Sequence, residues 1–177
     1  PYVIDWALDG PTSVGAVIQA FFPGEEGGTA IAGVLSGRIN PSGRLPVSLP
    51  RSAGAQPYTY LHPLLGGPSD VTTADASPVR SFGFGLSYTT FAYDDLDVDS
   101  EVPTDGVFAA SVRVTNTGDR PGDDVVQLYG RDLVASVTRP TVQLLGYRRL
   151  HLAPGESTIV RFEVPTTRLA FTDRRME

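Results

Sequence analysis

A strict alternation of apolar and polar residues in the second half of the chain constrains the fold most. VFAASVRVTNTG (107–118) places Val112 and Val114 on one face, and the turn signal NTGD closes this run. A period of two indicates a strand with one buried face. DVVQLYGRD follows, then two predicted strands around the turn APGE (153–156), and RLAFTD (168–173) is predicted to begin another. Short strands separated by regular turn signals predict an all-β sandwich.

In the first 52 residues, short apolar segments alternate with turn signals, as in an α/β unit. SVGAVIQAFF (13–22) predicts a short helix running into a strand, although periodicity alone does not separate these two. GGTAIAGVLSG (27–37) predicts a helix, with Gly37 at the position of a C-terminal cap. A turn and a short strand are predicted around Leu45–Leu49. One or two strands cannot build a sheet, so we expect exposed apolar surface on residues 1–50 unless a partner covers it.

The stretch between these halves is rich in Pro, Gly, Ser and Thr and shows no sustained period. A loop of this length is uncommon in a compact domain unless it is functional or a linker. In SFGFGLSYTTF (81–91), Gly83 and Gly85 permit a sharp turn. Phe82, Phe84 and Tyr88 are predicted to fill space between two layers. We expect an α/β portion at 1–52, a loop or linker at 53–85 and a β-sandwich at 86–177.

Composition excludes several classes of function. The formal net charge is −6 and the basic residues are scattered, which argues against nucleic-acid binding. The chain has no cysteine, and it has no apolar run long enough to span a membrane. His62 and His151 have no partners at metal-ligand spacing, so we expect no metal site and no cofactor.

Several segments resemble the C-terminal portion of family 3 glycoside hydrolases. AFFPGEEGGTAIAGVLSGRINPSGRLPVSLPRS (20–52) is similar to the end of that family's α/β-sandwich domain, and FGFGLSYTTF resembles the segment that follows it. VTNTGDRPGDDVVQLYGRD, SVTRPTVQLLGYRRLHLAPGES and LAFTD resemble successive strands of its fibronectin type III-like domain. The expected fold is therefore an α+β composite, the C-terminal part of an α/β sandwich followed by a fibronectin type III-like all-β sandwich. The family usually carries a further strand after LAFTD, so this sandwich would lack its last strand.

The resemblance implies the C-terminal structural portion of a retaining, exo-acting β-glucosidase or β-xylosidase that hydrolyses oligosaccharides. Its partners would be the barrel domain, the first part of the α/β sandwich, and an oligo- or polysaccharide substrate. Such an enzyme needs two carboxyl groups about 5–5.5 Å apart. In the family, the nucleophile lies on the barrel and the acid/base usually lies upstream of PGEEGG, and neither motif is present here. We therefore assign no catalytic residue and expect the isolated chain to be inactive.

Local residues offer weaker candidates. Glu25 and Glu26 are adjacent acids, but their place before the predicted helix indicates favourable helix-dipole electrostatics. Asp123 and Asp124 follow Pro-Gly and are predicted to lie on a turn surface. The candidates for the rim of a substrate entrance are in the 53–80 loop, where a surface linker is the alternative reading. These rim candidates are Tyr58, Tyr60, His62 and Asp70.

The alternative function is a non-catalytic carbohydrate- or protein-binding β-sandwich module. A coplanar strip of exposed aromatic side chains would favour it. The aromatic residues that the β part supplies are mostly at positions that predict an inward-facing side chain. The aromatic residues of the β part are Phe91, Tyr93, Phe108, Tyr129, Tyr147, Phe162 and Phe171.

Overall fold

The computed structural model describes residues 3–8, 11–55, 59–63, 70, 71, 75 and 77–175. Its chain divides into two compact units, each assembled from three separate stretches. Unit 1 comprises Pro1–Ile39, Gly43–Gly85 and Arg139–Thr141. Unit 2 comprises Asn40–Ser42, Leu86–Thr138 and Val142–Glu177. The short pieces Asn40–Ser42 and Arg139–Thr141 thus belong to a different unit from the residues on either side of them in the sequence.

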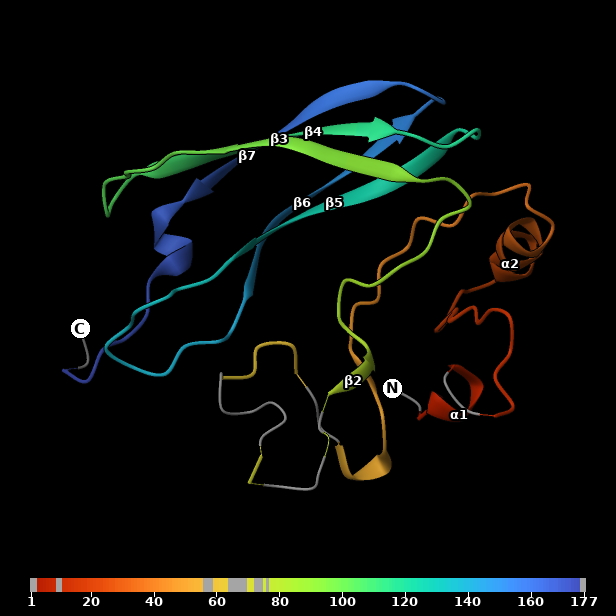
Figure 1. The fold of residues 1–177 in the computed structure, drawn as a ribbon, viewed down its shortest axis with the longest axis horizontal. Helices are drawn as coiled ribbons and strands as arrows, with labels where there is room; N and C mark the ends of the chain where they lie inside the picture. Colours follow the sequence, from red (N-terminus) through yellow and green to blue (C-terminus); the bar gives the residue numbers. More distant parts are fainter. Residues whose placement is uncertain are drawn as a thin grey trace. The chain divides into compact units, whose positions relative to one another are not determined.

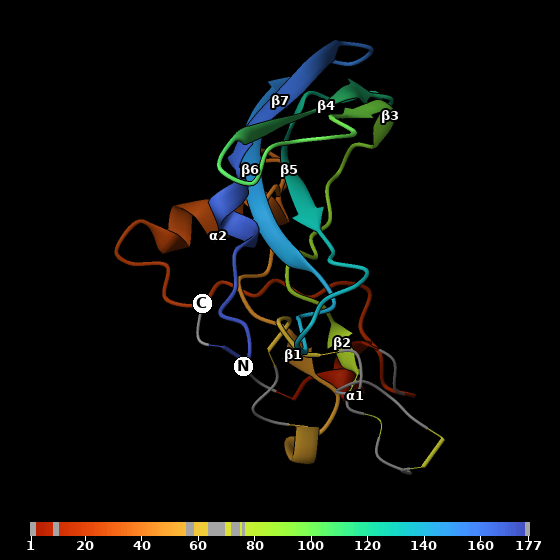
Figure 2. The same ribbon diagram turned by 90° about the vertical axis from the view of Figure 1, so that its left-hand side faces the viewer.

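Unit 2 is an antiparallel β-sandwich, as its alternation predicts. One layer has the strand order β3-β4-β7 and the other is the pair β5-β6. Figures 1 and 2 show these two layers facing each other. The strands are β3 (Phe91–Val98), β4 (Val107–Asn116), β5 (Gly122–Gly130), β6 (Gln143–Leu152) and β7 (Ser157–Pro165).

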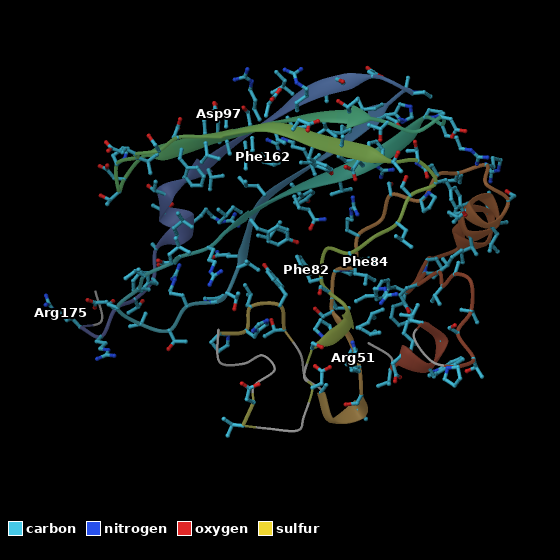
Figure 3. The ribbon with its side chains drawn as sticks, viewed as in Figure 1. Arg51, Phe82, Phe84, Asp97, Phe162 and Arg175 are labelled. Atoms are coloured by element: carbon cyan, nitrogen blue, oxygen red, sulfur yellow. The ribbon has the colours of Figure 1, made fainter. Side chains whose placement is uncertain are left out.

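The core of unit 2 lies between these layers. Val114 on β4 and Phe162 on β7 are buried against Val126 on β5 and Leu152 on β6. Phe162 is labelled between the layers in Figure 3. Full burial of one such side chain stabilises the fold by about 1.5–3 kcal/mol. This core explains why the alternating sequence of β4 sits in one register only, because a slip by one residue would expose its apolar face.

Strand β3 departs from regular geometry near its end. Its register with β4 shifts between Asp94 and Asp97, and Asp95 has a φ of 53°. Val98 pairs with Ala110, which faces the core, yet Val98 is 46% exposed and Leu96 is 69% exposed. The end of β3 therefore carries apolar side chains that the two-stranded layer does not cover.

The predicted strand at RLAFTD is wrong. Residues Thr166–Leu169 form the 3-10 helix η3, and 170–173 are irregular. Thr166 directs this change, because its hydroxyl donates to the carbonyl oxygens of Thr104 (2.7 Å) and Gly106 (2.9 Å). These bonds turn the chain at the end of β7, and none of the described strands pairs with 170–173.

Unit 1 contains two helices and one short strand pair. Helix α2 (Gly27–Leu35) forms where predicted, and Gly37 follows it with a φ of 74°, as a C-terminal glycine should. Helix α1 (Asp5–Leu8) precedes it, and η1 (Ala53–Ala55) is a single 3-10 turn. Strand β1 (Leu49–Pro50) is shorter than predicted, and it pairs antiparallel with β2 (Pro78–Arg80), which lies within the predicted loop.

The helix and strand predicted for 13–22 are wrong, because the structure has neither there. A strand needs a neighbour for its backbone groups, and no described strand pairs with this segment. Its apolar side chains, among them Val14, Ile18 and Phe22, are exposed, and Phe22 is 98% exposed. The predicted apolar surface on residues 1–50 is thus confirmed. The mixture of a few helices with antiparallel strands also confirms the predicted fold class.

None of the described helices has the length and apolarity that a bilayer crossing requires.

Candidate functional site

Three of the rim candidates, Tyr60, His62 and Asp70, are among the described residues of unit 1 and lie outside its helices and strands. Tyr58 lies outside the described residues. Tyr60 is half-buried, and its ring stacks on Phe82 with ring centroids 4.1 Å apart and planes inclined by 9°. Phe82 comes from the aromatic-glycine segment 81–91, so this stack joins the 59–63 loop to that segment. Sequence spacing gives no indication of this pairing across more than twenty residues.

His62 is held by a segment distant in sequence. Its carbonyl oxygen accepts hydrogen bonds from the Thr141 backbone N–H (3.0 Å) and the Thr141 hydroxyl (3.2 Å). Pro63 forms an isolated bridge with Pro140, and His62 Nδ1 lies 2.9 Å from the Pro63 carbonyl oxygen. The 59–63 loop is therefore fixed to residues 139–141. Asp70 is exposed and is not brought into this group.

The aromatic-glycine segment makes a close backbone approach within unit 1. Gly83 has a φ of 80°, and its N–H donates to the Leu45 carbonyl oxygen at 2.8 Å. The Leu45 N–H donates in turn to the Phe84 carbonyl oxygen at 2.8 Å. A Cβ on Gly85 would overlap the carbonyl oxygen of Gly43. The two glycines thus allow the sharp turn that the sequence predicts. Phe82 and Phe84 project from this turn (Figure 3).

The carboxyl groups of Glu25, Glu26 and Asp75 all lie on exposed side chains. Glu25 and Glu26 are exposed, and Glu26 occupies the N-cap position of α2 without a side-chain hydrogen bond. Hydrogen bonds from Ser77 and the charge of Arg51, 3.2 Å away, lower the pKa of Asp75. A general acid needs a raised pKa, so Asp75 is tuned in the opposite direction.

The turn-surface prediction for Asp123 and Asp124 is wrong, since both lie on β5. Asp124 is buried, and it accepts hydrogen bonds from the Tyr93 hydroxyl and from the Val125 N–H. The pKa of Asp123 is lowered by its hydrogen bond with His151 and by Arg149. Both aspartates therefore have structural partners. Among the described residues, no three His, Asp or Glu side chains converge as metal ligands.

A buried asparagine network in unit 2 is a further feature absent from the sequence prediction. Asn116 Oδ1 accepts from the Thr89 hydroxyl (2.7 Å) and the Gly118 N–H (3.1 Å). Its Nδ2 donates to the carbonyl oxygens of Arg120 (2.7 Å) and Leu152 (3.0 Å). These four bonds join two turns to β6. They also satisfy the donors and acceptors of the buried amide, which offsets the cost of its desolvation. Only the pattern of an Asn on the core side of an alternating strand could have indicated it.

The second asparagine of unit 2 comes from the first half of the sequence. Asn40 Oδ1 accepts from the Tyr88 N–H at 2.7 Å, and its Nδ2 lies 3.0 Å from the Ser87 hydroxyl. A Cβ on Gly122 would overlap the Asn40 amide, so the side chain fills the space beside the start of β5. Asn40 therefore belongs structurally to the β-sandwich.

Two aromatic residues of the β part, Tyr129 and Tyr147, face away from the core. Val126 and Leu152 point into the core, and alternation along β5 and β6 then turns Tyr129 and Tyr147 outward. Both side chains are exposed. Tyr129 and Tyr147 are thus exceptions to the prediction that these aromatic residues mostly face inward, and a register shift at Leu128/Tyr129 accompanies the burial of Leu145.

Comparison with known proteins places the chain in a family. Residues 1–88 match the glycosyl hydrolase family 3 C-terminal domain, and residues 124–177 match the fibronectin type III-like domain. The chain is 42% identical over 173 residues to a periplasmic beta-glucosidase of Salmonella typhimurium, covering 92% of this chain and 23% of that protein. It is 40% identical over 156 residues to a beta-xylosidase of Formosa agariphila, covering 86% and 22%.

A solved structure supports the same assignment. The β-glucosidase of Erythrobacter marinus matches with a TM-score of 0.82 and 41% identity, over 89% of this chain and 21% of that protein. The chain thus spans less than a quarter of the length of these relatives. With the sequence of the family's C-terminal domain followed by a fibronectin type III-like domain, the chain belongs to glycosyl hydrolase family 3.

Proposed function

We propose that this chain is the non-catalytic, C-terminal structural portion of a retaining, exo-acting β-glucosidase or β-xylosidase. Its partner would be the remainder of the same enzyme, which would supply both catalytic carboxyl groups and bind the oligosaccharide. The exposed apolar segment 13–22 carries this proposal, because a packed α/β domain would bury such side chains against its other elements.

The electrostatics of the chain agree with a structural role. Among the described residues, the carboxyl groups whose pKa departs from the ordinary value are Asp75 and Asp123, and both pKa values are lowered by hydrogen bonds and neighbouring cations. Groups of this kind stay ionised at neutral pH and stabilise local structure. Glycosidic bond cleavage requires a carboxylic acid that still holds its proton near neutral pH.

We also propose that the 53–80 loop borders the substrate entrance of the complete enzyme, with Tyr58, Tyr60, His62 and Asp70 on its rim. The Tyr60–Phe82 stack and the Thr141–His62 bonds support this, since they hold part of the loop in one conformation. A residue on the rim contributes to substrate binding but does not change the rate of the chemical step. Tyr60→Ala in the complete enzyme should therefore raise KM severalfold at an unchanged kcat.

Assay of the purified chain on aryl β-glucosides and aryl β-xylosides tests the proposed function. We expect no turnover above the uncatalysed rate. Turnover that persists through further purification would place the catalytic groups on this chain and refute the scaffold role. A mixture with the separately produced upstream part of the enzyme should regain activity if the two parts associate.

A further inference from the structure

The outer face of the β5–β6 sheet carries a row of side chains that the scaffold role does not use. The two strands lie side by side in unit 2 (Figure 2), and their core-facing residues alternate with this outward row. The outward residues pair across the strands as Gln127 with Tyr147, Val125 with Arg149, and Asp123 with His151. Aromatic groups thus lie toward one end of the row and ionic groups toward the other.

The ionic end is a preorganised cluster. Arg149 donates to Asp123 Oδ2 through Nε (2.9 Å) and Nη2 (2.5 Å), and His151 Nδ1 lies 2.5 Å from Asp123 Oδ1. The Arg149 and His151 side chains are nevertheless 65% and 67% exposed. The carboxylate therefore fixes two planar groups whose remaining nitrogens, Arg149 Nη1 and His151 Nε2, can serve an outside ligand. Fixed polar groups lose little conformational entropy on binding.

The aromatic end supplies a surface for stacking. Tyr147 is 64% exposed, and the neighbouring Tyr129 hydroxyl donates to Gln127 Oε1 at 2.5 Å. This bond orients the Gln127 amide beside the Tyr147 ring. A tyrosine presents an apolar ring together with a polar tip, which suits a ligand that has both characters.

Sugar rings match this sequence of groups. A pyranose has an apolar face of C–H groups and a rim of hydroxyls, which are donors and acceptors at once. Residues two apart on a strand are about 7 Å apart, so a ligand lying along β6 would pass from Tyr147 to Arg149 and then His151. Val125, the aliphatic residue in the middle of this row, is half-buried, so the groups that the face offers to a ligand are the aromatic and ionic side chains on either side of it.

We propose that the outer face of β5–β6 is a binding site for a β-linked glucan or xylan chain. One sugar ring stacks on Tyr147, and hydroxyls of a neighbouring ring hydrogen-bond to Arg149 and His151. The choice of β-linked glucan or xylan rests on the proposed function, whereas the site itself rests on the geometry of the face. The face would hold substrate chains to the scaffold.

Isothermal titration of the full chain with cellohexaose and with xylohexaose tests this site. Binding of either hexasaccharide is expected, and the one that binds identifies the sugar. Tyr147→Ala should weaken binding about tenfold, which corresponds to the loss of one ring contact. Tyr147→Phe keeps the ring and should retain binding. Tyr88→Ala and Asp97→Asn change exposed residues of unit 2 outside this face and should have no effect.

Thermal unfolding of each variant shows whether it is folded, so that a loss of binding can be assigned to the face. The proposal is overturned if the wild-type chain binds neither hexasaccharide, or if folded Tyr147→Ala binds as tightly as wild type. Chromatography of the sugars after titration separates this result from the proposed function. Intact sugars with no binding refute the site alone, whereas shortened sugars refute the scaffold role.

Discussion

Single residues decide how closely the segments of unit 1 can approach. Gly85 lies against the Gly43 carbonyl oxygen, where any Cβ would overlap backbone that has little room to move. We expect Gly85→Ala to lower the free energy of unfolding by about 1–3 kcal/mol, the usual cost of overpacking. Urea denaturation followed by circular dichroism measures this. Gly54→Ala is the matched control, because its Cβ would meet open space, and equal destabilisation by both would contradict the explanation.

At the scale of elements, the β5–β6 strand pair makes the free energy of unfolding depend on pH. His151 and Arg149 lower the pKa of Asp123 in the folded state below the ordinary 3.8. The unfolded chain therefore takes up this proton first, so the stabilisation is complete above the ordinary value and is lost as the pH falls through the folded-state pKa. Because Arg149 and His151 are exposed, its size is at most about 1 kcal/mol.

The corresponding measurement compares wild type with Asp123→Asn. The difference in their free energies of unfolding should be complete at pH values above the ordinary 3.8 and should shrink as the pH falls below it, because the wild-type carboxylate then becomes protonated as well. Asp97→Asn, on exposed β3, should show no such trend. A difference that stays constant over this range would mean that Asp123 acts through its shape and not through its charge.

Elements also show how far the sequence could predict the structure. Strands β4, β5, β6 and β7 follow from alternation, because a half-buried strand has only one workable register. Helix α2 follows from its spacing and from Gly37. The structure of segment 13–22 could not be predicted from its sequence, since an apolar run becomes a strand only when another strand pairs with it. The outward positions of Tyr129 and Tyr147 follow from alternation counted from Val126 and Leu152, whereas the shift at Leu128/Tyr129, which accompanies the burial of Leu145, has no signature in residue type.

The whole molecule is marked by apolar surface on unit 1. Val17, Ile18 and Phe22 are all exposed on one irregular segment. We expect the isolated chain to bind a fluorescent apolar dye such as ANS and to self-associate at micromolar concentrations, because such surface associates in water. Replacing these three residues with serine should reduce both signals without lowering the midpoint of thermal unfolding.

Size-exclusion chromatography with light scattering provides the second readout. The matched control replaces Leu133 and Val134, which are also exposed but belong to unit 2. If this control reduces dye binding and self-association as strongly as the first variant, the association surface does not lie on segment 13–22.

The assembly of each unit from three stretches has a consequence for anyone who divides this chain. A fragment that begins at residue 86 would leave out Asn40, whose amide fills the space beside Gly122 and bonds the Tyr88 backbone. A fragment that ends at residue 85 would lose Thr141, which holds the His62 carbonyl. Neither severed half keeps all its own hydrogen bonds, so genetic excision of either piece should yield a product less stable than the same piece in the uncut polypeptide.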